Sequence, residues 1–314
     1  LQRAGFASLD RGAEHYGLGV ALGNGEVTLW EAARAYAGLA RGGTLYPLRA
    51  VLEARRADGS VLEPKPELNA HRLADPRAVA LITDILSDNP ARARAFGLDN
   101  ALRFSFPVAA KTGTSKGYSD NWTVGYTRER TVAVWAGNFD GTPMVQVSGI
   151  TGAGPVFKRV MRRAMEGLTP APLISEAGLV HASICPLSGG LAGPRCPSSM
   201  DELFMRGTQP RAPCAMHRPV AAGLPEELRS RCGEQVTDLG VDYYDWAHHT
   251  GLQEEPWLAA ACAGVSAADG RAKILSPSTG DEYLLLDDLP LADQAIPLRI
   301  RAAPALGPLE VRLD

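Results

Sequence analysis

Three short β-like runs follow one another between residues 106 and 138, and they constrain the fold more than any other part of the chain. The first run is Phe106–Ala110, which leads directly into a Lys-Thr-Gly tripeptide. The second and third, Trp122–Thr127 and Thr131–Asn138, are joined by the tight polar turn Arg128-Glu129-Arg130. Consecutive runs joined in this way predict strands of an antiparallel sheet.

Helix signals surround these runs. Thr28-Leu29-Trp30-Glu31 has the form of a capping box, and the helix that it starts should end at Gly42-Gly43. Asp75-Pro76 predicts a second helix start, and a third helix should begin near Pro155. Residues 45–63 have a hairpin pattern around Asp58-Gly59. The fold class that we expect is therefore α+β, with an antiparallel sheet flanked by helices.

The apolar positions indicate which faces of these helices are buried. In the second helix we expect one buried face, made of Val79, Ile82, Ile85 and Leu86. In the third helix, the apolar residues at three- and four-residue steps are Val156, Phe157, Val160, Met161 and Ala164.

Composition limits the partners and the location of the chain. It has 314 residues, of which 45% are apolar and 21% charged, which is ordinary globular composition. A net charge of -3 and the lack of long basic runs argue against a nucleic-acid partner. No apolar stretch reaches the ~18 residues of a membrane span. Because the chain begins at Leu1 without a signal peptide, we expect the natural protein to begin further upstream.

Changes of amino-acid composition and of secondary-structure pattern along the chain predict three parts. Thr169-Pro170-Ala171-Pro172 is a linker signal, and the chain from there to residue 270 is rich in Pro, Gly and Cys. After Arg271 come short β-like runs, among them Tyr283–Leu286 and Ile296–Ile300. We therefore expect a first domain at 1–168, a linker and Cys-rich segment at 169–270, and a small β-sandwich-like domain that starts at 271 and is cut off at 314.

The tripeptide Lys111-Thr112-Gly113 carries the clearest chemistry. A substrate that ends in a free carboxylate needs a fixed positive charge and hydroxyl donors, which Lys111, Thr112 and Thr114 can supply. Gly113 removes a side chain where a substrate would approach the strand. The strand edge offers amides that can hold a peptide as an added strand, and an amide near Thr114 could donate to an oxyanion.

The surrounding sequence resembles a known family. Lys111-Thr112-Gly113-Thr114 is followed by Asp120 and Trp122, then Val124–Thr127, Trp135, Gly137-Asn138 and Asp140-Gly141. In this order, the stretch 110–142 closely resembles the class A penicillin-binding proteins, in which Lys-Thr-Gly is one of three catalytic elements. Ile85–Asn89 with Arg92 and Ala95–Gly97 resemble the 1C branch in particular, and so does the Cys-rich stretch from Cys185 to His217. The resemblance covers nearly the whole chain.

This resemblance implies a fold, a reaction and a location. The fold is that of penicillin-binding transpeptidases and serine β-lactamases. The parent protein would polymerise lipid-linked disaccharide and cross-link peptidoglycan stem peptides at D-alanyl-D-alanine, and it would bind β-lactams. It would lie at the bacterial inner membrane, facing the periplasm, and an N-terminal anchor outside this chain would be its only membrane contact. Lys111, Thr112, Thr114 and Ser115 would bind the substrate, Gly113 would complete the catalytic motif, and no cofactor or metal is expected in the site.

The nucleophile of that family is absent from these residues. It lies in Ser-x-x-Lys, and the chain contains no such tetrapeptide. The second family element, Ser-x-Asn, has two apparent copies, Ser87–Asn89 and Ser119–Asn121. The second copy follows Lys-Thr-Gly, which is the wrong order, and the first is also a helix-stop pattern. We therefore expect the chain alone not to acylate.

Two other functions are compatible with the sequence. A D,D-carboxypeptidase or β-lactamase-like hydrolase would share the fold, but small secreted β-lactamases have no comparable tail. A non-catalytic peptidoglycan-binding module is the other, and sacculus binding by residues 169–314 alone would favour it.

The cysteines leave two possibilities open. All five lie after residue 184, at positions 185, 196, 214, 232 and 262. In an exported protein, a disulfide that involves Cys185 and Cys196 is the plainer expectation. A zinc site of Cys185, Cys196, Cys214 and His217 is the alternative, because the Cys214-x-x-His217 spacing suits a metal.

Overall fold

The computed structural model describes residues 1–51, 53–62, 69–264, 273–277 and 298–301. The chain forms two compact units. The first consists of Leu1–Val180 with Leu203–Thr208, and the second of His181–Glu202 with Gln209–Asp314. The three-part division expected from the sequence stays a prediction, and most of its last part, including Tyr283–Leu286, lies outside the described residues.

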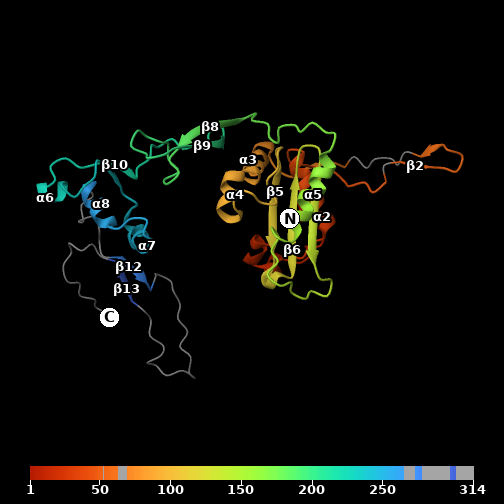
Figure 1. Ribbon diagram of the computed structural model, residues 1–314, viewed down its shortest axis with the longest axis horizontal. Coiled ribbons are helices and arrows are strands. Elements are labelled where there is room, and N and C mark those ends of the chain that lie inside the picture. The colour runs from red at the N-terminus through yellow and green to blue at the C-terminus, as the bar shows by residue number, and fades with distance from the viewer. Residues whose placement is uncertain (52, 63–68, 265–272, 278–297, 302–314) are drawn as a thin grey trace, which may run out of the picture. The chain divides into compact units, whose positions relative to one another are not determined.

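A three-stranded antiparallel sheet forms the centre of the first unit (Figure 1). Its strands are β5 (Ala109–Thr114), β6 (Asp120–Tyr126) and β7 (Thr131–Gly137), in the order β5-β6-β7. The register pairs Gly113 with Trp122, and Trp122 in turn with Trp135. The antiparallel sheet expected from the sequence is therefore confirmed, and the Lys-Thr-Gly motif lies within an edge strand.

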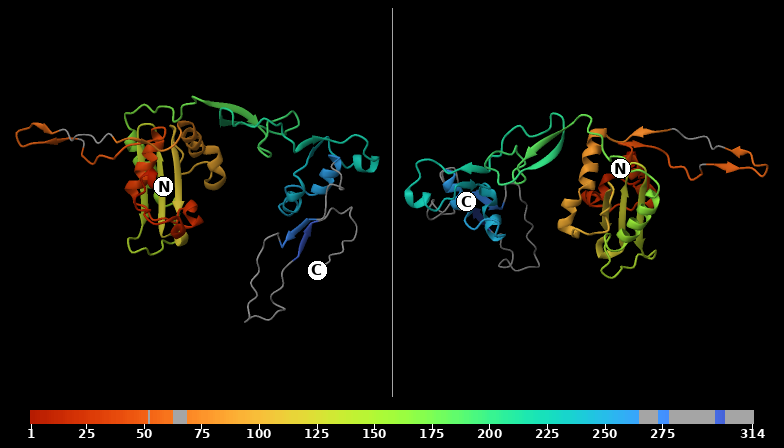
Figure 2. Two further views of the ribbon diagram at one scale, coloured as in Figure 1. Left: turned by 180° about the vertical axis from the view of Figure 1, so that it is seen from behind. Right: turned by 45° about the horizontal axis from the view of Figure 1, so that its top comes forward.

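Helices cover both faces of this sheet, as views from two sides show (Figures 1 and 2). On one face, Phe157 and Met161 of α5 (Ala153–Met165) pack with Ala110 and Val132. On the other, α2 (Leu29–Ala40) contributes Ala40, which packs with Ala109 and Tyr126. Neighbouring residues of a strand point to opposite faces, so Ala109 and Ala110 belong to different cores. The mixed α+β class is confirmed.

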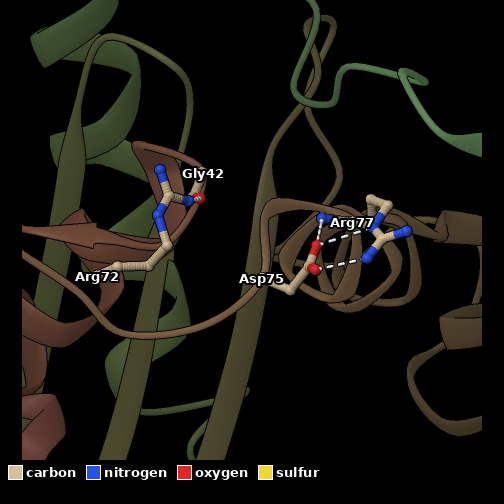
Figure 3. A network of polar contacts seen from close by, with 4 residues as sticks. All are labelled: Gly42, Arg72, Asp75 and Arg77. Carbon is tan, nitrogen blue, oxygen red and sulfur yellow. Dashed lines mark hydrogen bonds and ion pairs between the residues drawn. The ribbon is translucent and has the colours of Figure 1, made fainter.

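Two further helices lie on the β5 side of the sheet, α3 (Pro76–Ser87) and α4 (Asn89–Phe96) (Figures 1 and 2). The Asp75 carboxylate accepts a hydrogen bond from the Arg77 amide and pairs with the Arg77 guanidinium, which fixes the start of α3 (Figure 3). Pro76 occupies the first turn, where its missing amide proton is not needed. The capping box predicted at the start of α2 is also present.

The buried face of α3 differs from the predicted one. Ile82 and Ile85 are 47% and 63% exposed, whereas Thr83 is only 2% exposed. The Thr83 hydroxyl donates to the Val79 carbonyl and lies 2.8 Å from the Tyr126 hydroxyl. A threonine whose hydroxyl is satisfied in this way can replace an apolar residue in a core. In α5 the helix is confirmed, but Val156 and Val160 are nearly half exposed.

The remaining elements of the first unit are short. The predicted hairpin around Asp58-Gly59 is present, and its strands are β2 (Ala54–Arg55) and β3 (Val61–Leu62). It lies inside a second pairing between β1 and β4. The other short elements are η1 (Gln2–Ala4), α1 (Ala13–Tyr16), η2 (Leu18–Leu22), β1 (Thr44–Leu45), β4 (His71–Arg72) and η3 (Lys116–Tyr118).

The second unit consists mainly of two-stranded ladders and short helices. Strands β8 (Leu179–Ile184) and β9 (Met200–Met205) form one ladder. The first two residues of β8 and the last three of β9 belong to the first unit. Strands β10 (His217–Pro219) and β11 (Gln235–Thr237) form another, and β12 (Lys273–Ser276) pairs with β13 (Arg299–Arg301). The helices are α6 (Glu226–Arg229), η4 (Val241–Tyr243), α7 (Tyr244–His249) and α8 (Pro256–Cys262).

Among the described residues, none of the helices combines the length and the apolar character needed to cross a bilayer.

Candidate functional site

The outer edge of β5 is the centre of the candidate site. The Ser115 amide donates to the Asp120 carbonyl, on the β6 side. Backbone groups alternate between the two edges of a strand, so the amides of Thr112 and Thr114 face away from β6. No described residue accepts a hydrogen bond from either amide. The edge therefore offers two outward-facing donors in the middle of the motif.

Lys111 brings a positive charge to the same edge. Its side chain leaves the strand on the α2 face but is exposed, and Nζ donates to the Thr112 carbonyl oxygen at 2.7 Å. No carboxylate of the described part of the chain lies within ion-pair distance of Nζ. The ammonium is therefore available to an anionic ligand.

Thr112 and Thr114 point to the opposite face of β5 from Lys111, because side chains alternate along a strand. The Thr114 hydroxyl accepts a hydrogen bond from the Gly149 amide at 2.9 Å, and the Thr123 hydroxyl donates to the Gly149 carbonyl at 3.0 Å. The loop at Gly149 is thus held on β5 and β6 by two threonines. Accepting this bond leaves the Thr114 hydroxyl proton free to donate to a ligand.

The loop at Gly149 has no room for a side chain. A Cβ at this position would collide with the Gly113 carbonyl oxygen and would lie 2.7 Å from the Trp122 carbonyl oxygen. Gly113 has a different environment, since a Cβ there would meet the Trp122 side chain at 3.4 Å. Sequence reasoning missed Gly149, because its close approach to the sheet leaves no local signal.

Ser115 holds the turn after the motif. Its hydroxyl accepts from the Asp120 amide at 2.7 Å, and the Asp120 carboxylate accepts from the Trp135 indole at 2.9 Å. Asp120 therefore joins the turn to β7, which gives a physical role to the Asp-x-Trp pattern. Ser115 is a turn residue in this structure, and its predicted contact with substrate stays a prediction.

Residues of the two Ser-Asp-Asn copies have structural roles in the fold. The Asp88 carboxylate accepts from the Ala91 amide at the start of α4, and the Ser87 hydroxyl donates to the Asp84 carbonyl. Asn121 is fully buried on the α5 face of β6, opposite to the face from which Lys111 leaves. The first copy therefore serves the junction between α3 and α4, and Asn121 of the second copy is part of the sheet's buried face.

Arg92 of α4 covers the β5 edge just before the Lys-Thr-Gly motif. Sequence reasoning missed this role of Arg92. Its guanidinium donates to the Ala110 carbonyl at 3.4 Å and to the Asn89 side chain at 3.0 Å. Burial lowers the pKa of this guanidinium from its usual value. The open part of the edge therefore begins at Thr112.

Cysteine pairing differs from the expected pattern. The disulfide joins Cys232 and Cys262 in the second unit. Cys185 and Cys196 are free thiols, as is Cys214, so the predicted disulfide between Cys185 and Cys196 is wrong.

An outward-facing strand edge with a lysine and two threonines, on a sheet covered by helices, agrees with the family comparisons. Residues 6–162 match the family described as the penicillin binding protein transpeptidase domain. Residues 175–219 match the family described as penicillin-binding protein 1A, C-terminal domain. The chain belongs to the penicillin-binding protein transpeptidase family.

Individual relatives narrow the relationship. Penicillin-binding protein 1C of Escherichia coli is 28% identical over 250 residues, which cover 78% of this chain and 30% of that protein. Penicillin-binding protein 1A of Pseudomonas aeruginosa is 30% identical over 48% of this chain and 18% of its own length. The crystal structure of penicillin-binding protein 1A from Haemophilus influenzae shares the fold, with a TM-score of 0.56, 21% identity, and coverage of 68% of this chain and 36% of that one. The chain thus spans about a third or less of these relatives.

Proposed function

We propose that the β5 edge binds the carboxyl-terminal end of a peptidoglycan stem peptide, in a D,D-transpeptidase that cross-links such peptides. The observation that carries this proposal is the convergence of the Lys111 ammonium and the outward amides of Thr112 and Thr114 on one open strand edge. A peptide can add there as a further strand, with its carboxylate near Lys111 and the two threonine hydroxyls. The Thr114 amide would donate to the oxyanion of the reacting carbonyl.

The covalent step needs a serine that these residues do not supply. In the proposed reaction, a serine attacks the terminal D-alanyl-D-alanine bond, D-alanine leaves, and an amine of a neighbouring stem peptide resolves the acyl-enzyme. Because the 314 residues contain no Ser-x-x-Lys, we infer that they do not acylate alone. Similarity to class A proteins supports a bifunctional parent at the periplasmic face of the inner membrane, which also polymerises lipid-linked disaccharide and binds β-lactams.

Mass spectrometry after incubation with penicillin tests this proposal. The 314-residue chain should keep its mass, whereas the full product of the open reading frame that contains it should gain one penicilloyl group. In that product, Lys111→Ala should slow acylation by about 10²-fold or more. Arg162→Ala, which removes a positive charge from the exposed face of α5, should leave the rate unchanged.

Three results would change the conclusion. An adduct on the 314 residues alone would contradict the inferred lack of acylation. A reading frame without Ser-x-x-Lys would favour a non-catalytic peptidoglycan-binding module. Release of product by water alone, even with an acceptor amine present, would favour a hydrolase.

A further inference from the structure

Four potential metal ligands meet in the second unit. They are Cys185, Cys196, Cys214 and His217, and their ligand atoms all lie within 4.8 Å of one another. Cys185 directly follows β8, Cys196 lies in the loop between β8 and β9, and His217 is the first residue of β10. Residues distant in sequence are therefore brought to one point.

The distances within this cluster suit a tetrahedral ion. The His217 Nδ1 atom lies 3.5 Å from the Cys185 sulfur and 3.3 Å from the Cys214 sulfur. Around zinc, bonds of ~2.3 Å to sulfur and ~2.0 Å to nitrogen place a sulfur and a nitrogen about 3.5 Å apart. A single imidazole nitrogen is thus directed at two sulfurs at once, which a shared ion explains better than a single hydrogen bond.

A disulfide accounts for less of this arrangement. Three thiols surround one imidazole, so any disulfide would leave one thiol and the histidine without a function. Cys185 is 0% exposed and His217 is 8% exposed, so both ligands are shielded from solvent. The disulfide of this unit lies elsewhere, between Cys232 and Cys262. The unit therefore contains cysteines of two kinds.

The backbone around the cluster is organised to hold the sulfurs together. The Cys185 amide donates to the Gly190 carbonyl and the Cys185 carbonyl accepts from the Gly189 amide, both at 2.8 Å. A Cβ on Gly190 would lie 3.3 Å from the Cys214 backbone, so a glycine lets the two turns approach closely. The Gly193 amide donates to the Cys196 sulfur at 3.3 Å, a bond that would also stabilise a thiolate.

In the described part of the second unit, cross-links can take the place of a hydrophobic cluster. All three hydrophobic clusters found among the described residues belong to the first unit. Small segments without a sizeable core commonly depend on disulfides or a structural metal. We propose that Cys185, Cys196, Cys214 and His217 bind one structural Zn²⁺. Three thiolates and one imidazole fill all four positions, so no position remains for a substrate or a catalytic water.

Elemental analysis of the purified 314-residue chain tests the proposal. Chain produced with zinc in the medium and then dialysed should retain about one zinc per molecule. Cys214→Ser and His217→Gln should each reduce this content to near zero. The matched control is the double variant Cys232→Ser and Cys262→Ser, which removes two cysteines from the same unit and should retain the zinc.

Two further measurements keep the test independent of variant folding. Cobalt added to the metal-free chain should give the sulfur-to-metal charge-transfer absorption of a thiolate site. Three thiols should become reactive after chelation without reduction. Wild-type chain that holds no zinc, zinc content unchanged in both ligand variants, or thiols that appear only after reduction would each overturn the proposal.

Discussion

The Glu31 carboxylate joins the start of α2 to the N-terminal segment around Ser8. It accepts hydrogen bonds from the Ser8 hydroxyl at 2.6 Å, the Ser8 amide at 2.8 Å and the Thr28 amide at 2.9 Å. These bonds, led by that of the Ser8 hydroxyl, lower the pKa of Glu31 from 4.5 to about 2. All of them stabilise the ionised form, so protonation of Glu31 weakens the folded state.

The pH dependence of stability should therefore contain a contribution from Glu31. Because its pKa is lower in the folded state, the stabilisation is complete above about pH 5 and is lost as the pH falls toward 2. We predict that Glu31→Gln removes on the order of 2 kcal/mol near neutral pH and progressively less in acid. Urea unfolding of both proteins between pH 7 and pH 3 measures this difference. A difference that does not change with pH would contradict the assignment.

The buried pair Thr83 and Tyr126 joins α3 to the central strand β6. Burial raises the pKa of Tyr126 to about 12, and its hydroxyl has the Thr83 oxygen as its partner. We predict that Thr83→Val costs about 1–3 kcal/mol, because the tyrosine hydroxyl is left buried without a partner. In a Tyr126→Phe background the same substitution should cost distinctly less. Slowly exchanging amides of β6 report the change, and equal costs in both backgrounds would show that the hydroxyls do not interact.

At the scale of elements, the loop at Gly149 supports the β5 edge. We predict that Gly149→Ala displaces the loop, because the added Cβ would collide with the Gly113 carbonyl. The Thr114 hydroxyl would lose the amide that orients it. Hydrogen exchange of residues 144–152 should accelerate by about tenfold or more, which corresponds to a local cost of about 1–3 kcal/mol.

A matched glycine separates this effect from the general cost of an alanine. Gly233 has ordinary backbone angles, and a Cβ added to it would meet a single neighbour, the Gln235 carbonyl oxygen, at 3.7 Å. Gly233→Ala should leave exchange in residues 144–152 unchanged. Protection of these residues that is retained in Gly149→Ala would show that the loop tolerates a side chain, which would contradict the predicted collision.

Local sequence signals predicted where the helices begin. The differences between prediction and structure come from contacts between residues that are distant in the sequence. The capping box at Thr28 and the start of α3 at Asp75-Pro76 depend on neighbouring residues, so the sequence reveals them. The burial of Thr83 depends on Tyr126, a residue far along the chain, and the apolar pattern of α3 therefore indicated the wrong face. The pairing of Cys232 with Cys262 likewise depends on how α8 packs, which spacing alone does not reveal.

For the whole molecule, the motif was easier to predict than the site around it. Lys111, Thr112 and Thr114 were predicted from the Lys-Thr-Gly motif, whose residue types suit a carboxylate-binding strand. The sequence did not show that Lys111 reaches the strand edge from the face of β5 opposite to Thr112 and Thr114. It also did not show that Arg92 covers the edge at Ala110. These features depend on strand alternation and on the position of α4, which only the fold provides.

The central claim is that the β5 edge binds the carboxylate of the substrate. The most direct test is to titrate the 314-residue chain with a stem peptide that ends in D-alanyl-D-alanine and to monitor the amide chemical shifts of the chain by NMR. We predict shifts at Thr112, Gly113 and Thr114 that saturate with peptide concentration. They should weaken by about tenfold or more when the peptide carboxylate is amidated or when Lys111 is replaced by alanine. Shifts that are absent from β5, or that are unaffected by amidation, would contradict the assignment of this edge as the carboxylate-binding site.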